Sequence, residues 1–177
     1  MQTKVNFDPR VRESLNLFVR ALEVASGDSF IASILLVSDD GRRLGCFVAP
    51  SLPDDFCNAI EGEEIGPAAG SCGAAAYLGH EVYTHDIETD PLWVLYRELA
   101  LKHDLRSCWS TPILNEANEV MATFAIYHRT PSSPSSAEVE AIRLASRALL
   151  PLIEAKSDMS RKTLTAVSPN PPPAGPA

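Results

Sequence analysis

The residues best suited to chemistry in this chain cluster between positions 66 and 127. This segment holds both tryptophans, two of the four cysteines and three of the four histidines. At its start, the run Gly70-Ser71-Cys72-Gly73 is typical of a turn that enters a helix. A helix start offers free N–H groups and a positive dipole end, so it could receive an anion, a carboxylate or a polar ligand edge. The alternative is a helix start that Ser71 caps and that packs against the last strands.

Cys72 also has two interpretations. A thiol at a helix N-terminus has a lowered pKa and is reactive, whereas a buried cysteine often serves as a small apolar filler. Cys108 lies in an expected strand and could approach Cys72 across a pocket. Cys46 and Cys57 add no C-x-x-C pair and no regular spacing. We therefore expect reduced thiols and no structural zinc site.

The histidines give no sign of a metal site or a catalytic site. His80, His85, His103 and His128 lack metal-ligand spacing. His85 next to Asp86 could form an oriented acid–base pair, but an exposed strand residue is the favoured interpretation. We predict no catalytic residue and no bound metal.

Aromatic and charged residues complete the candidate site. Trp93, Tyr96 and Trp109 could form an aromatic wall for a small ligand, or they could be core with bonded indole N–H groups. We place Trp93 at the pocket rim and leave Trp109 open between the two. Arg106 is best explained by an ion pair with Asp86 or Asp90, the alternative being an anionic ligand. Three nearby acidic residues are interpreted as a solvated turn: Glu61, Glu63 and Glu64.

Composition excludes several classes of function. The chain has 177 residues, a formal net charge of -8 and a 45% hydrophobic fraction, which suits one globular domain. The acidity disfavours nucleic acid and anionic lipid surfaces as partners. No apolar run approaches the roughly 20 residues of a membrane span, and the N-terminus lacks the apolar region of a signal peptide. We expect a cytoplasmic protein without nucleic-acid or membrane partners.

Periodicity predicts a helix at each end of the domain and two hairpins. Apolar residues recur at helical spacing over 11–26, with Leu15, Phe18, Val19 and Leu22 inward. Strands are expected at 31–37 and 43–49 around the turn signal Asp39-Asp40-Gly41, and at 80–87, 107–114 and 120–128. Short helices are expected at 53–60 and 72–78, one at 91–103 with Leu92, Leu95, Leu99 and Tyr96 inward, and a long one after Pro134 that includes Leu144 and Leu152.

These elements predict an α+β fold. Hairpins enforce one antiparallel sheet, with the terminal helices on one face and the middle helices and loops over the other, where a cavity would lie. We predict a single domain over residues 1–156 and a disordered Pro-rich tail over 157–177.

Four sequence blocks in the expected order resemble the GAF domain, of the type found in bacterial sensor histidine kinases and cyclic-di-nucleotide signalling proteins. They read GSCGAAAY, VYTHDIETDPLW, HDLRSCWSTPI and VMATFAIY. The resemblance covers about residues 13–155. It departs from the family pattern at Asp104, which replaces a glycine and which we expect to tolerate a left-handed turn. It also departs at Ala74, often threonine in the family, and at Met121-Ala122, usually Leu-Gly.

The resemblance implies a small-molecule-sensing or signal-transducing domain. No kinase, cyclase or DNA-binding motif is visible, so the chain would act on a separate signalling partner or be a fragment of a larger sensor. GAF modules commonly dimerise through their terminal helices, and we expect a homodimer here. The expected ligand is an unknown small molecule with anionic character. Its expected binding residues are Ser71, Cys72, Gly73, Trp93, Tyr96, Arg106 and Trp109.

Other GAF chemistries are the alternatives. Free methionine-R-sulfoxide reductases carry a G-x-C-G cysteine that Cys72 matches, but their downstream I-A-C-D motif is missing and Cys108 would have to replace its cysteine. Bilin attachment needs a cysteine near Asp86-Ile87, and none is adjacent. We therefore expect no enzyme and no cofactor.

Overall fold

Two tight turns determine how the sheet forms. The structure is a computed structural model that describes residues 8–165. Gly41 has a φ of 72° and closes the first hairpin, as the Asp-Gly signal predicts. The second hairpin turns at Asn118, whose φ is 60°, and the Asn115 side-chain oxygen accepts from the N–H groups of Ala117 and Glu119. Both turns force antiparallel neighbours.

The resulting sheet has six strands in the order β3-β2-β1-β6-β5-β4, and all of its pairs are antiparallel. Its strands are β1 (Ile31–Val37), β2 (Arg43–Val48), β3 (Glu63–Glu64), β4 (Val82–Thr84), β5 (Ser107–Leu114) and β6 (Val120–His128). The central strands β1, β6 and β5 are almost wholly buried, so both faces of the sheet need a cover.

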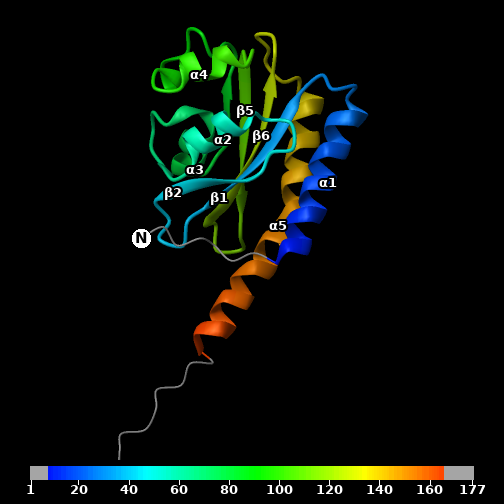
Figure 1. Cartoon of the computed structure of the whole chain (residues 1–177), viewed down its shortest axis with the longest axis vertical. Coiled ribbons are helices and arrows are strands. Elements are labelled where there is room, and N and C mark those ends of the chain that lie inside the picture. Colours follow the sequence, from blue (N-terminus) through cyan, green and yellow to red (C-terminus); the bar gives the residue numbers. More distant parts are fainter. Residues whose placement is uncertain (1–7, 166–177) are drawn as a thin grey trace, which may run out of the picture.

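Helices cover both faces, each over its own apolar core (Figure 1). The long helices α1 (Pro9–Ala25) and α5 (Ser136–Thr165) lie on one face, where Leu15, Ile142 and Leu149 pack against the strands. The short elements lie on the other: α2 (Asp54–Ile60), α3 (Gly70–Leu78), the 3₁₀ turn η1 (Pro91–Trp93) and α4 (Arg97–Lys102). The predicted α+β class and layer arrangement are confirmed.

The end of α1 is fastened by a carboxylate to which the sequence pattern assigns no role. Glu23 is fully buried and accepts hydrogen bonds from the Ala32 N–H at 2.9 Å and from the Ser51 hydroxyl at 2.6 Å. Arg20 adds an ion pair at 3.1 Å. A buried carboxylate is tolerated only with such partners, so Glu23 fixes α1 to the start of β1 and to the segment after β2.

The predicted helix over 91–103 is wrong in its first half. Trp93 N–H donates to the Asp90 carbonyl and Tyr96 N–H to the Trp93 carbonyl, so each bond spans three residues. A three-residue repeat puts Trp93 and Tyr96 on one side, and Leu95, expected inward, is 79% exposed. The strand expected over 80–87 is likewise reduced to β4.

The terminal helices also differ from the prediction. Phe18, expected inward, is exposed, and so are Leu144 and Leu152 on the long C-terminal helix, because the sheet contacts only one stripe of each helix. The helix α5 continues beyond the predicted boundary at 156, where good helix formers such as Met159 and Leu164 follow. The rest of the predicted tail, 166–177, lies outside the described residues.

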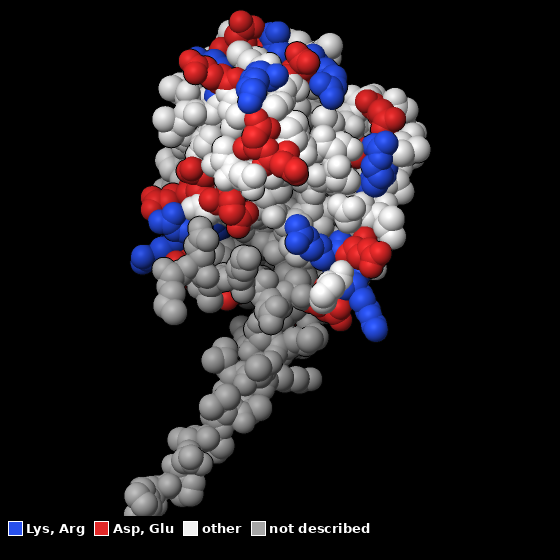
Figure 2. All heavy atoms as spheres, viewed as in Figure 1, with Lys and Arg blue, Asp and Glu red and all other residues white. Residues whose placement is uncertain are grey.

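Two features bear on large partners. Among residues 8–165 no helix combines the length and the apolarity that a membrane crossing requires. On the face shown in Figure 2, basic and acidic side chains are interspersed, without a continuous basic patch among the residues described there. The exclusion of nucleic acid therefore stays a prediction from composition and charge.

Candidate functional site

A small cavity lies between the sheet and the short helices, on the face where the sequence predicts one. Its volume is about 40 Å³. Five of the seven expected site residues line it: Ser71, Cys72, Gly73, Trp93 and Tyr96. The rest of the lining comes from Leu35, Leu44, Phe56, Ile60, Glu63, Glu64, Ala69, Gly70 and Tyr127.

The cavity meets the first turn of α3. Gly70 has a φ of 62°, which glycine adopts at no steric cost. Gly73 is required for another reason, because a Cβ atom there would overlap the methyl group of Ala69. The first N–H groups of a helix have no acceptor inside it. The helix starts where the sequence predicts it, whereas binding of a ligand by its first N–H groups stays a prediction.

Ser71 has a different role from the predicted helix cap. The residue before α3 is Ala69, and no side chain caps the helix. The Ser71 hydroxyl instead points into the core, where it donates to Thr84 Oγ1 at 2.9 Å and accepts from the Trp93 indole Nε1 at 3.1 Å. The same indole N–H lies 3.2 Å from Thr84 Oγ1. This triangle joins α3, β4 and η1 behind the cavity.

Trp93 and Tyr96 form the aromatic wall, but Trp93 is not at the rim. Trp93 is only 3% exposed, so it belongs to the core and presents part of its ring to the cavity. Tyr96 packs edge-on against it, with ring centres 6.5 Å apart. Its hydroxyl donates to Glu63 at 3.0 Å. Burial, with the nearby Glu63 carboxylate, raises the pKa of Tyr96 to about 12, so the phenol stays protonated and can keep donating.

Two buried thiols lie near each other, and one of them, Cys72, lines the cavity. Cys72 and Cys108 are near enough to shift each other's pKa, which agrees with the predicted approach of the two residues. The Cys72 sulfur also lies 3.7 Å from the Tyr127 hydroxyl. The interaction with Cys108 lowers the pKa of Cys72, whereas burial raises the pKa of Cys108. Of the two, Cys72 is therefore the better nucleophile and also the one that lines the cavity.

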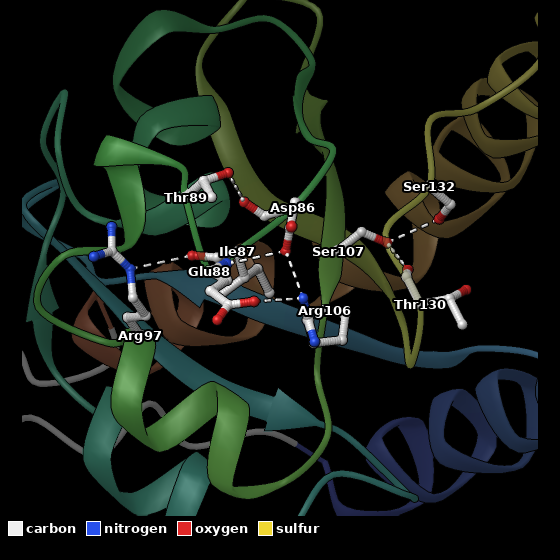
Figure 3. Close-up of polar contacts among 9 residues, drawn as sticks. All are labelled: Asp86, Ile87, Glu88, Thr89, Arg97, Arg106, Ser107, Thr130 and Ser132. Carbon is white, nitrogen blue, oxygen red and sulfur yellow. Dashed lines mark hydrogen bonds and ion pairs between the residues drawn. The ribbon is translucent and has the colours of Figure 1, made fainter.

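Arg106 does not line the cavity. Its guanidinium pairs with Asp86 at 3.3 Å and with Glu88 at 2.7 Å (Figure 3). A backbone hydrogen bond joins the same two segments, because the Ile87 N–H donates to the Arg106 carbonyl at 2.7 Å. The predicted ion pair with Asp86 is confirmed. Arg106 thus positions the loop between β4 and η1, and with it Trp93.

A second arginine holds the other side of this loop. Arg97 donates to the Ile87 carbonyl at 3.3 Å (Figure 3). It also donates to the Asp90 carbonyl at 3.0 Å. Asp90 in turn accepts from the Leu92 N–H and caps the start of η1. The fully buried Ile87 anchors the loop in the core. The loop is therefore a rigid support for the tryptophan.

Trp109 lies on the opposite face of the sheet. Its indole packs 4.3 Å from the His128 ring and donates to the Ser132 carbonyl at 3.0 Å. The fully buried Ser107 on the same strand makes hydrogen bonds to the Thr130 carbonyl and the Ser132 hydroxyl (Figure 3). These bonds hold the segment 130–132 after β6 in place. Of the two interpretations left open for Trp109, the structure selects the core.

The charges at the cavity differ from those expected for an anion site. Glu63 and Glu64 are its charged lining residues, and no described lining residue is basic. Both are predicted to lie in a solvated turn, but they form β3 and pair with Leu44 and Arg43. Phe56, Ile60 and Tyr127 were also missed, since apolar periodicity marks a core position without showing that a cavity borders it.

Metal ligands are not assembled in the described part of the chain. No group of three or more His, Cys, Asp or Glu side chains there could hold a metal ion. His85 is exposed and bonds Ser133 at 3.1 Å, which agrees with its interpretation as a surface residue.

Comparison with known proteins identifies one domain family. A family model described as a GAF domain matches residues 10–154. The methyl sulfide methyltransferase-associated sensor of Methanosarcina acetivorans is 34% identical over 113 residues, which are 64% of this chain and 11% of that protein. The chain thus spans only a small part of that relative.

Solved structures show the same fold at low identity. The GAF domain of a phosphoenolpyruvate-protein phosphotransferase from Coxiella burnetii has a TM-score of 0.69 at 16% identity, covering 89% of this chain and 90% of that chain. Free methionine-R-sulfoxide reductase from Neisseria meningitidis has a TM-score of 0.66 at 15% identity, covering 84% and 81%. Sensory domains and an enzyme therefore share this scaffold.

Proposed function

Because the chain belongs to the GAF domain family, we propose that it is a regulatory domain that senses a small molecule and acts on a separate signalling protein in the cytoplasm. The observation that supports this proposal best is the cavity at the start of α3, enclosed by Cys72, Trp93 and Tyr96. A cavity with an apolar wall and a few directed donors is the usual form of a small-molecule site.

The lining favours a particular ligand chemistry. Leu35, Leu44 and Phe56 offer an apolar surface, whereas the α3 backbone offers N–H donors and a positive dipole end. A molecule with an apolar body and one carboxylate or carbonyl edge fits both. An anionic ligand would depend on the helix end alone, since the charged side chains at the cavity are Glu63 and Glu64.

The ligand must enlarge the cavity in order to enter. Ligand sites usually measure about 300–1,000 Å³, whereas this cavity of about 40 Å³ has room for only a few water molecules. The weakest wall is β3, which pairs with β2 through two residues only. The Tyr96–Glu63 hydrogen bond closes the same side. We infer that β3 and α2 move outward on binding.

The output surface is an apolar stripe along the terminal helices. Leu17, Ala21 and Val24 form an exposed i, i+4, i+7 row on α1. A second exposed row on α5 consists of Ala141, Leu144, Ala148 and Leu152. Such rows match the seam of paired helices, and α5 extends beyond the body of the domain (Figure 1). These helices would join two copies of the chain and transmit the signal.

Thermal-shift screening followed by native mass spectrometry tests the proposal. Small carboxylates, amides and nucleobases are offered to the full chain, and compounds that raise Tm are measured as bound mass. We expect 1:1 binding that the cavity variant Ala69→Leu abolishes, while the surface variant Ala59→Leu on α2 retains it. Binding that survives Ala69→Leu, or a complete lack of binders, would contradict a sensing cavity at this position.

One observation favours an enzyme as the second candidate. Cys108 lies near Cys72, so it could replace the thiol that the reductases carry elsewhere. Against this, both thiols are buried and the cavity holds no substrate-sized space. The test is loss of free methionine-R-sulfoxide with dithiothreitol as reductant. Turnover that Cys72→Ser abolishes would establish the enzyme, and an inactive wild-type chain would exclude this activity.

A further inference from the structure

A second pair of thiols lies on β2 and α2, two elements whose neighbouring residues Leu44, Phe56 and Ile60 line the cavity. Cys46 is on β2 and Cys57 is on α2, and both are half-buried and pack against the core of that face. The backbone around them is fixed, because the Cys46 N–H donates to the Glu61 carboxylate at 2.7 Å. Glu61 immediately follows α2. The two thiols are thus held on neighbouring elements that are tied together at one end.

The Cys46 and Cys57 thiols influence each other, and their pKa values are shifted in opposite directions. Each thiol is near enough to shift the pKa of the other: their interaction raises the pKa of Cys46 and lowers the pKa of Cys57. A thiol with a lowered pKa is the attacking member of a dithiol pair. Unlike Cys72 and Cys108, both also have exposed surface through which a small reagent can reach them.

We propose that Cys46 and Cys57 form a redox-active dithiol, a modification site that low-molecular-weight disulfides oxidise to a reversible disulfide between β2 and α2. The inference does not depend on ligand binding. It follows from two partly exposed free thiols that pack against the same core on adjacent elements, β2 and α2.

The reaction balances with a small disulfide as oxidant. The Cys57 thiolate attacks one sulfur of the reagent, and the reagent's S–S bond breaks to release one thiolate. Cys46 then loses its proton to solvent and attacks Cys57 Sγ, which releases the second thiolate. The protein loses two hydrogens in all, and the reagent gains them as two thiols. A dithiol such as dithiothreitol reverses both steps.

The disulfide would restrain the wall that ligand entry requires to move. Phe56 and Ile60 flank Cys57 on α2 and line the cavity. A covalent bond to β2 would limit the outward motion of this helix. Oxidation would therefore favour the closed cavity, which makes the pair a means of coupling thiol redox state to sensing.

The native full chain is incubated with glutathione disulfide, alkylated, and digested with proteases that cut at Asp and Glu. Trypsin is unsuitable, because no Lys or Arg lies between Arg43 and Arg97 and three cysteines share that peptide. Cleavage before Asp54 and after Glu61 separates Cys46, Cys57 and Cys72. We expect a linked Cys46–Cys57 peptide pair that dithiothreitol removes, with Cys72 and Cys108 alkylated only after denaturation.

Single variants assign the order of attack. In Cys46→Ser the glutathione adduct should accumulate on Cys57. In Cys57→Ser modification of Cys46 should slow by about tenfold or more, the factor that one pKa unit makes in thiolate fraction. Cys72→Ala, which lies outside the pair, should still form the linked peptides. A link between Cys72 and Cys108 instead, or a native chain whose Cys46 and Cys57 stay reduced, would overturn the proposal.

Discussion

The Trp93 indole Nε1 donates a hydrogen bond to the Ser71 hydroxyl, 3.1 Å away. This bond connects two of the four sequence blocks that resemble the family, one at the start of α3 and one that ends at η1. Thr84 on β4 completes the connection. The position of the cavity wall therefore depends on a buried polar cluster rather than on aromatic packing alone.

Trp93→Phe tests whether the indole hydrogen bonds of Trp93 support both the stability of the domain and the binding of a cavity ligand. The variant keeps an aromatic ring but loses the indole donor, and leaving buried hydroxyls poorly paired costs about 1–3 kcal/mol. We expect a lower free energy of unfolding in urea and loss of the Tm increase that cavity ligands cause. Trp93→Ala should cost about 3–5 kcal/mol and also removes the ring that lines the cavity, so it is the less specific variant.

Trp109→Phe is the matched control for this variant. Trp93 and Trp109 are each 3% exposed, and each indole is bonded, but Trp109 lies on the opposite sheet face. Its replacement should lower stability comparably while ligand-induced stabilisation persists. If both variants lost the ligand-induced Tm increase equally, the loss would reflect general destabilisation. It would then give no support for a binding site beside Trp93.

Gly73→Ala tests the close approach at the start of α3. A Cβ atom at this buried position would overlap Ala69 Cβ, and overpacking typically costs about 1–3 kcal/mol. We expect a lower Tm and lower urea midpoint. Gly66→Ala serves as the control, because a methyl group at that position would have no atom within 4 Å. A neutral Gly73→Ala would mean that the α3 start relaxes freely.

The sequence predicts the framework of this fold because local signals and global packing agree there. The Asp39-Asp40-Gly41 turn forces the first hairpin, and the apolar run from Ile31 forms a strand buried on both faces. Asp104 adopts a φ of 58°, as expected for the residue that replaces a glycine in the family pattern. Turn chemistry and periodicity suffice for these features.

The site is predicted less completely because its geometry depends on contacts between distant segments. Helical periodicity cannot show that η1 is a 3₁₀ turn, which directs Leu95 outward and Trp93 into the core. Likewise, Glu63 and Glu64 carry the composition of a solvated turn, yet β2 recruits them as an edge strand. Tertiary pairing overrides local propensity at both places.

Acid should destabilise the chain partly through His128. Burial lowers the pKa of His128 from the ordinary value of 6.5, while neighbouring groups only partly oppose this. Since the unfolded chain then binds the proton first, the contribution is fully present above about pH 6.5 and is lost as pH falls through the lower folded pKa. Unfolding free energies between pH 8 and 5 should fall more steeply for wild type than for His128→Asn.

An NMR titration of the His128 ring checks the same prediction directly. The ring lies against Trp109 and Phe30, so its resonances should titrate below those of a free histidine. An upward displacement, or an unchanged pH dependence of stability in His128→Asn, would contradict the assignment.

Leu144→Glu should dissociate the homodimer proposed to form through the terminal helices. Leu144 is 57% exposed in the centre of the apolar row on α5, and a buried carboxylate without a partner is strongly unfavourable. We expect the dimer Kd to rise by at least about tenfold, a change of roughly 1.4 kcal/mol, with unchanged Tm. Light scattering after size exclusion measures the mass. Leu95→Glu introduces the same charge at the exposed η1–α4 turn over the other sheet face and should leave the dimer intact. A wild-type monomer at high concentration, or equal dissociation by both variants, would show that the α1 and α5 rows do not join two copies.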